Sequence, residues 1–328
     1  MKNEEMKASD VLVKNVIDEK KKDLNLAKEI EEDKTESIPS NYIEVKLSSL
    51  GQLGMPSMVH VRDYTYNEAL MMAEIKEDNM TEGIIKILDN IIFEDLDMKK
   101  AHKQDVVEIL LSIYGTWYSP VLEVFNYFVN EDLEEEEKKA KTNISVATIP
   151  INNIQTTPVK EGSKLPITFK SKDLNVQLIL PRIGNDIVAW KFAVKKNLKT
   201  EVKIAESIKA VKNEKYTDKQ MEDYEKFVSQ RGKDFLKALQ CQLIYSIDDE
   251  KLNTFSKQIE AIDKVSFSLW KKYNKVVKEN FHFGVEEEVK FECSVIHKEI
   301  ARRFRFQPIH FLPILDKEDD SRFEISFG

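Results

Sequence analysis

The cysteine and histidine residues near the end of the chain are the side chains best suited to hold a metal ion. Cys293 and His297 are separated by three residues, and His282 and His310 stand on either side of them. A thiolate and three imidazoles would make a chemically reasonable tetrahedral zinc site. Structural zinc sites, however, normally contain a Cys-x-x-Cys pair, and no second cysteine follows Cys293. We therefore expect Cys293 to be a buried strand residue, keep Cys293 and His297 only as weak metal candidates, and expect no cofactor.

Residues 285–306 alternate between apolar and charged side chains. Val285, Val289, Phe291 and Cys293 occupy one set of alternate positions, and glutamate and lysine occupy most of the other. A period of two is typical of a strand with one buried face. Residues 301–306 repeat the pattern with arginine in place of glutamate. The two segments together predict a β-hairpin with cross-strand ion pairs.

A basic cluster occupies the second strand of this hairpin. It contains four cations and two aromatic rings: Lys298, Arg302, Arg303, Arg305, Phe304 and Phe306. Interleaved basic and aromatic side chains are typical of single-stranded nucleic-acid binding. In an extended strand, however, neighbouring side chains point to opposite faces, so the rings would lie away from Arg303 and Arg305. We expect the arginines to pair with the acidic face formed by Glu286, Glu288 and Glu292.

Sequence signatures of catalysis are missing from the chain. It has no Walker-type phosphate loop, no Gly-x-Ser-x-Gly and no His-Glu-x-x-His, and its 5 histidines are scattered singly. Its 9 glycines leave little room for loops that cradle phosphates. We therefore predict that the protein is not an enzyme.

Composition narrows the range of partners. A formal net charge of -8 argues against general affinity for nucleic acid or anionic membranes. No stretch approaches the 18 or so consecutive apolar residues that a membrane span requires. The first ten residues lack the apolar core of a signal peptide, and 2 cysteines fit a reducing compartment. We expect synthesis in a cytoplasm, with neither a nucleic-acid nor a membrane partner.

The spacing of apolar residues predicts a helix-rich α+β protein. In the first half it predicts a β-hairpin at 42–62, helices at 67–77, 81–93 and 103–114, and an amphipathic aromatic stretch at 117–128.

In the second half, strands are predicted at 167–169 and 176–180, followed by a turn and helix cap at 184–186 and then a helical segment that contains Trp190. Long apolar stripes at 217–243 and 248–276 then predict two helices. Because the connection between them is short, we expect an antiparallel helical hairpin.

Length and composition also predict a division into domains, because 328 residues exceed the usual size of one domain. We expect a charged N-terminal arm at 1–38, which is flexible or becomes ordered on a partner. The other predicted parts are an α+β domain at 39–133, a charged and proline-bearing linker at 134–166, a helical domain with a terminal β-hairpin at 167–315, and a C-terminal tail at 316–328.

Several short patches, in this order, resemble one protein family. Residues 45–51 are similar to a strand that carries a Leu-Pro-Ser-like turn and a glycine, with Ser48 where proline is common. Residues 59–62 look like a Val-x-Val-Arg strand, and residues 65–68 like a Thr-x-x-Glu helix start. An Asp-led apolar helix ending in Tyr-Gly matches residues 105–115. These patches resemble the baseplate hub assembly family of T-even-type contractile bacteriophages.

The end of the chain extends the resemblance. Members of this family often finish with a small zinc-ribbon-like hairpin and an aromatic-proline tail, and residues 291–293 and 304–313 look like their remnant. The missing second cysteine departs from that pattern, so the expected hairpin is a degenerate one. The fold class that we expect is therefore α+β, with two domains, small β-hairpins, a long helical hairpin and a degenerate zinc-ribbon-like hairpin.

The resemblance implies a structural or assembly role in a contractile phage tail, in the virion at the baseplate. Partners would be other tail and baseplate proteins, or further copies of the chain. Aromatic and arginine side chains are enriched at protein interfaces, and on that ground we select as interface candidates Trp117, Tyr118, Phe125, Arg303, Arg305, Phe306 and Phe311. Two alternatives stay open: an assembly chaperone absent from the virion, and a cytoplasmic nucleic-acid-associated protein.

Overall fold

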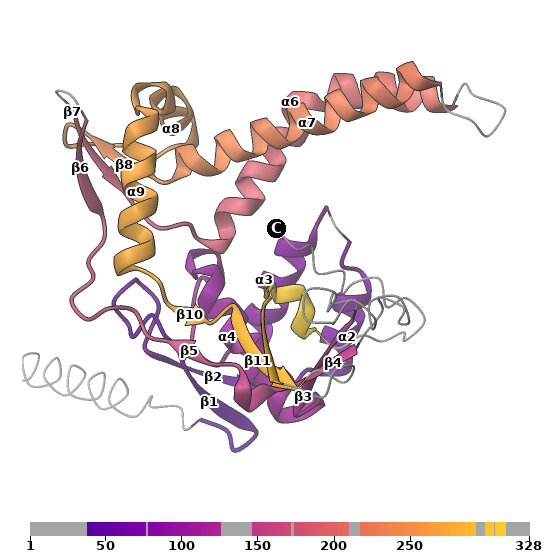
Figure 1. The fold of residues 1–328 in the computed structure, drawn as a ribbon, viewed down its shortest axis with the longest axis vertical. Coiled ribbons are helices and arrows are strands. Elements are labelled where there is room, and N and C mark those ends of the chain that lie inside the picture. The colour runs from indigo at the N-terminus through magenta and orange to yellow at the C-terminus, as the bar shows by residue number, and fades with distance from the viewer. Residues whose placement is uncertain are drawn as a thin grey trace, which may run out of the picture. The chain divides into compact units, whose positions relative to one another are not determined.

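The structure is a computed structural model that describes residues 38–76, 78–125, 146–171, 174–209, 217–292, 299–304 and 306–312. The chain divides into two compact units, residues 1–40 and 41–328, and all elements below belong to the second. Figure 1 shows that this unit mixes helices with short antiparallel strands, in agreement with the predicted α+β class.

The first elements are a β-hairpin and three helices. Strand β1 (Tyr42–Lys46) pairs antiparallel with β2 (Met58–Arg62), as predicted. Helices α2 (Tyr66–Ala73), α3 (Met80–Ile91) and α4 (Lys103–Ile113) follow within a few residues of their predicted bounds. Helix α2 begins at a capping box, in which Thr65 and Glu68 satisfy each other's backbone amides. The periodicity of buried Ile and Val residues therefore predicted this part well.

The largest hydrophobic core combines both ends of the second unit. Helices α3 and α4 contribute most of its buried aliphatic residues, and β1 and β2 cover it with Val45, Val59 and Val61. Phe304 and Phe311, from the C-terminal end, are also fully buried in this core. The terminal hairpin is thus part of the same core as the first helices.

The predicted aromatic stretch at 117–128 does not continue as a helix. A single π-helical turn, η2 (Tyr114–Tyr118), ends before Pro120, and strand β3 (Val121–Phe125) follows. Proline cannot donate a helical hydrogen bond, and Val and Phe favour strands, which explains the change.

Residues 146–166, within the predicted linker, contribute to the fold. Strand β4 (Val146–Pro150) pairs with β3, and β5 (Thr156–Thr157) pairs with β10 (Gly284–Val285). The side chains of Ile149, Ile154 and Val159 are buried. This stretch is therefore extended, as expected, and packs along neighbouring elements.

A second core surrounds a four-stranded sheet. Strands β6 (Ile167–Ser171), β7 (Leu174–Leu178), β8 (Ile244–Ile247) and β9 (Glu250–Lys251) are neighbours in that order. Helices α8 (Phe255–Ala261) and α9 (Phe267–Asn280) supply the other buried residues, including Trp270 and Tyr273.

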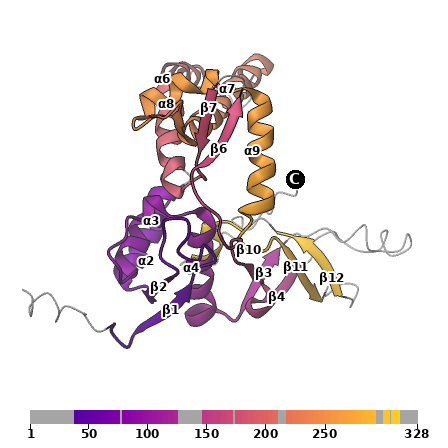
Figure 2. The same cartoon turned by 90° about the vertical axis from the view of Figure 1, so that its left-hand side faces the viewer.

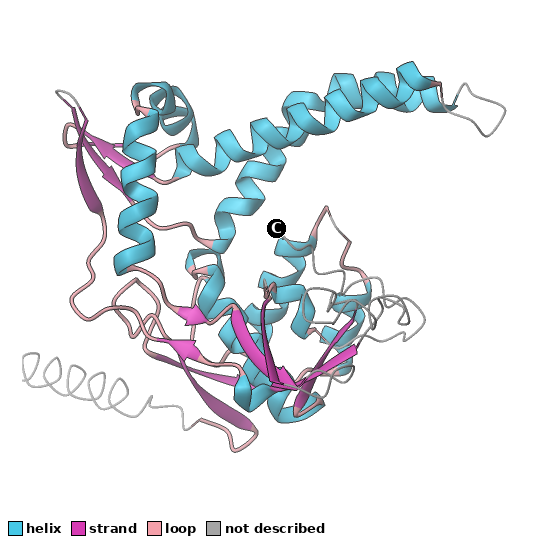
Figure 3. Ribbon diagram, in the orientation of Figure 1, coloured by secondary structure: helices cyan, strands magenta, loops and turns pink. Residues whose placement is uncertain are grey.

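The long helical hairpin exists, but with a different partner helix. Figure 3 shows α6 (Ile183–Lys209) and α7 (Asp218–Gln242) side by side. The prediction that residues 248–276 form the partner of α7 is wrong. After α7 the chain forms strand β8, and Asp248 and Asp249 turn it back with φ values of 47° and 65°. Ile, Tyr and Ile at 244–247 favour a strand, which ends the helical run.

The terminal β-hairpin is confirmed. Among its predicted ion pairs, those that involve Arg302, Arg305 or Glu292 rest on side chains outside the described residues. Strand β11 (Glu288–Glu292) pairs antiparallel with β12 (Glu299–Arg303) and lies beside β4, as Figure 2 shows. Arg303 Nε donates to the Glu287 carboxylate at 2.7 Å. Glu286 instead accepts a hydrogen bond from Thr157, because β10 pairs with β5 and turns this carboxylate toward that strand. Cys293, His297 and Arg305 lie outside the described residues.

Candidate protein–protein interface

The interface candidates chosen from the sequence occupy different environments. Phe311 is fully buried against Tyr114 and Phe306, so it presents no surface to a partner. Phe306 and Trp117 are partly buried against the large core. Arg303 is exposed beside Glu287. Arg305 and the side chain of Phe125 lie outside the described residues.

Tyr118 is the exposed aromatic residue among these candidates. Its side chain is 41% exposed, its ring packs 5.7 Å from that of Tyr64, and its hydroxyl donates to Asp63 Oδ1 at 2.8 Å. Burial raises the pKa of both tyrosines, so the two hydroxyls stay protonated. Nearby in sequence, Tyr66 and Leu70 are exposed one turn apart on α2. These rings and Leu70 offer apolar surface to a partner.

The polar residues in the resembling patches hold the fold together. Ser48, in the loop after β1, donates its backbone N–H to Glu108 of α4 at 2.8 Å, and its hydroxyl bonds the same carboxylate. Arg62 of β2 donates two hydrogen bonds of 3.1 Å to the Glu68 carboxylate. The first contact joins patches 60 residues apart in the sequence, and the second joins neighbouring ones.

Burial and the Arg62 guanidinium shift the pKa values of the acidic and histidine side chains in this part of the fold. It raises the pKa of Glu108 to about 7, and that of Asp105 to about 6. The Arg62 guanidinium holds the pKa of Glu68 down at about 2. His102, whose ring lies 2.9 Å from Pro181 O and 3.2 Å from Leu53 O, has a pKa lowered by burial. All four of these side chains make contacts inside the fold, and none of them faces an open cleft.

Helices α6 and α7, called here the helical arm, form the longest element pair, and the seam between them is polar. Asn197 donates to Asp234 Oδ2 at 3.0 Å, and Lys196 lies 2.5 Å from Asp234 Oδ1. The Arg231 guanidinium sits 5.1 Å from the centre of the Trp190 ring. Polar and aromatic contacts therefore join the two helices, with few aliphatic residues between them.

The apolar residues of the arm lie mostly outside this seam. Five of them are 40–52% exposed: Leu198, Val202, Met221, Tyr224 and Val228. Leu198 and Val202 are one turn apart on α6, and the other three follow i, i+3, i+7 spacing on α7. Each helix therefore shows solvent an apolar stripe that no described residue covers.

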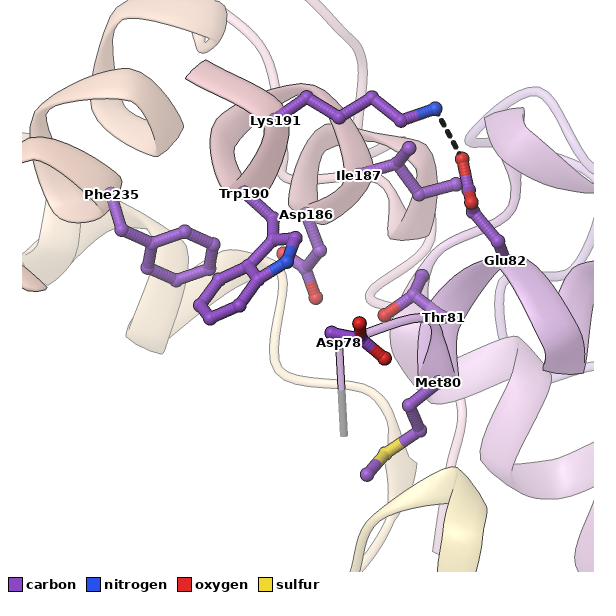
Figure 4. A pocket seen from close by; sticks show the side chains of 9 residues that line it. All are labelled: Asp78, Met80, Thr81, Glu82, Asp186, Ile187, Trp190, Lys191 and Phe235. Atoms are coloured by element: carbon purple, nitrogen blue, oxygen red, sulfur yellow. Dashed lines mark hydrogen bonds and ion pairs between the residues drawn. The ribbon is translucent and has the colours of Figure 1, made fainter. Parts of the chain in front are cut away.

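A small pocket lies at the base of the arm. Its volume is about 160 Å³, and it is lined by α3 residues, among them Met80, and by Ile187, Trp190 and Phe235 of the arm. Figure 4 shows the two aromatic rings beside each other, and an ion pair between Lys191 and Glu82 that joins α6 to α3. Ile187 precedes Leu198 by three helical turns, so pocket and stripe share one side of α6.

Sequence reasoning found the apolar stripe of α7 but assigned it to the contact between the two helices of a hairpin. The buried positions of α7 are Phe227, Asp234, Ala238, Cys241 and Gln242. Phe227 is the one large apolar residue in this set, so hydrophobicity alone pointed to the wrong face. The usable signal was the pair of small residues, Ala193 and Ala238, which permits close helix approach.

Comparisons with known proteins do not assign this chain to a family or a function. No family model, no curated protein and no solved structure matches the chain. Within the described part of the chain, no group of His, Cys, Asp or Glu residues is placed to hold a metal ion. None of the described helices is long and apolar enough to cross a membrane.

Proposed function

We propose that this protein is a structural or assembly component of a contractile phage tail baseplate, and that it acts through protein–protein interfaces without catalysis. The observation that carries the proposal is the ordered set of sequence patches that resemble those of the baseplate hub assembly family. Their arrangement in the fold supports it, because residues from separate patches bond one another, as Ser48 does with Glu108 and Arg62 with Glu68. Such patches form one structural framework.

The exposed apolar surfaces support an assembly role. Helices in a pair normally bury their apolar stripes against other helices. The apolar stripe on the helical arm is exposed, and so are Tyr66, Leu70 and Tyr118. The fold itself does not bury these apolar side chains. Extended apolar surface of this kind marks interaction sites on proteins.

Mass spectrometry of purified phage particles and of the infected-cell lysate tests the proposal. A baseplate component is expected in mature tails at a fixed ratio to other tail proteins. Presence in the lysate but absence from particles would assign the chaperone role instead. Absence from phage particles, combined with salt-sensitive binding of the purified protein to single-stranded DNA, would contradict both roles.

A further inference from the structure

The distal half of the helical arm has the surface of half a helical bundle. From Leu198 outward on α6, and up to Val228 on α7, nearly all described side chains are exposed, with Phe227 as the buried exception. The apolar stripe in this region contains Leu198, Val202, Met221, Tyr224 and Val228. Two helices alone cannot cover such a stripe, and a four-helix bundle would do so.

The two helices contact each other at defined levels along the arm. Asn197 bonds Asp234, Arg231 lies 4.0 Å from Glu201, and the Gln220 side chain donates to Ser207 O at 2.9 Å. Residues 198–206 of α6 therefore lie across from residues 221–230 of α7. With these faces in the seam, helical geometry places both apolar stripes on the same long side of the arm.

The two helices carry opposite charge at this level. Helix α6 exposes Lys195, Lys199 and Lys203 against one exposed acid, Glu206, among its described residues. The first turns of α7 expose four acidic residues, Asp218, Glu222, Asp223 and Glu225, and two lysines, Lys219 and Lys226. Lys226 pairs with Glu222 at 2.6 Å, so three of the four carboxylates have no ion pair among the described residues of α7. A two-fold axis along the arm would place α6 of one copy on α7 of the other. The lysines of each α6 would then face the carboxylates of the other copy's α7, and this contact would occur twice, as an isologous interface requires.

We propose that the helical arm binds the arm of a second copy of this chain, side by side, to form a four-helix bundle. The apolar stripes form the centre of the interface, and lysines of each α6 face carboxylates of the partner's α7. The inference goes beyond the baseplate assignment and does not depend on it, since it concerns the purified chain alone.

Light scattering coupled to size-exclusion chromatography of the full chain, over a range of concentrations, tests the proposal. A dimer is expected. The double substitution Leu198→Glu with Val228→Glu places two charges in the bundle centre and should weaken the dimer at least tenfold. Thr200→Glu with Ser229→Glu adds the same charges at exposed positions outside the stripe and should leave it intact. A wild-type chain that stays monomeric would overturn the proposal.

Charge reversal tests the pairing of α6 with α7 directly. Lys199→Glu with Lys203→Glu makes both rims acidic, and Glu222→Lys with Glu225→Lys makes both basic, so each variant alone should be monomeric. An equimolar mixture should form a heterodimer, because acidic rims then meet basic ones on both sides. Circular dichroism confirms that each variant stays helical. Dimers of either variant alone, or no association in the mixture, would contradict the proposed pairing.

Discussion

At the residue scale, buried carboxyl groups connect the stability of the protein to pH. Glu108 has a pKa of about 7 in the folded chain, against 4.5 for an ordinary glutamate. Because the native state keeps its proton longer, this group's contribution to stability falls as the pH rises from about 4.5 to 7. Asp105, raised to about 6 by burial, acts in the same direction.

Replacing Glu108 by glutamine should therefore stabilise the protein at alkaline pH. The amide keeps an oxygen that accepts from the Ser48 backbone N–H, but it carries no charge to bury. We expect a gain of about 2 kcal/mol at pH 8 and almost none at pH 4. Urea unfolding at the two pH values measures this difference. A variant that is less stable than wild type at pH 8 would contradict the burial argument.

Glu68 has the opposite pH dependence. Two hydrogen bonds from Arg62 lower its pKa to about 2, so its stabilising effect is present above pH 4.5 and is lost as the pH falls toward 2. Glu68→Ala removes the carboxylate partner of Arg62, which keeps its hydrogen bonds to two backbone carbonyls, and it removes the capping box of α2. We expect a loss of about 2–4 kcal/mol at pH 7 and a smaller loss near pH 2. Glu74→Ala, at the exposed end of α2, is the control and should change little.

At the element scale, two glycines in the helical arm differ in what surrounds them. A Cβ at Gly184 would lie 2.7 Å from Lys99 O, where α6 packs against the turn before α4. A Cβ at Gly232 would meet nothing within 4 Å. Gly184→Ala should therefore destabilise by about 1–3 kcal/mol, whereas Gly232→Ala should stabilise α7 by about 0.5–1 kcal/mol. Thermal unfolding of both variants measures the contrast, and equal shifts would contradict it.

Elements with strong local signals were predictable from the sequence, and their partners were not. Helix α4 was predicted to within one residue, because Val106, Leu110 and Ile113 repeat with helical spacing and are all buried. The helix expected at 248–276 is divided into α8 and α9 and starts later than predicted. Its start was missed because the turn at Asp248–Asp249 depends on positive φ values, which an apolar stripe does not reveal. The side of α7 that packs was also hidden, since Asp234 is buried through bonds to Lys196 and Asn197 on another helix.

At the scale of the whole second unit, the distal arm contributes no residue to the described hydrophobic core clusters. None of the buried residues in the three described core clusters lies between residues 199 and 229. The seam contacts at Asn197 and Asp234 stay within the proximal half of the arm. A short Gly-Ser loop in place of residues 199–229 should therefore leave all three core clusters folded.

The shortened chain separates stability from association. We expect its free energy of unfolding to differ from that of wild type by no more than about 1 kcal/mol, because the one buried side chain removed among the described residues is Phe227, which belongs to none of the three core clusters. Its self-association should be lost, because all five residues of the apolar stripe are gone or lie at the new junction. Calorimetry and light scattering on the same sample measure both quantities. A chain that unfolds would show that the distal arm supports the cores, whereas a folded chain that still dimerises would place the self-association surface elsewhere, for example at Tyr66, Leu70 and Tyr118.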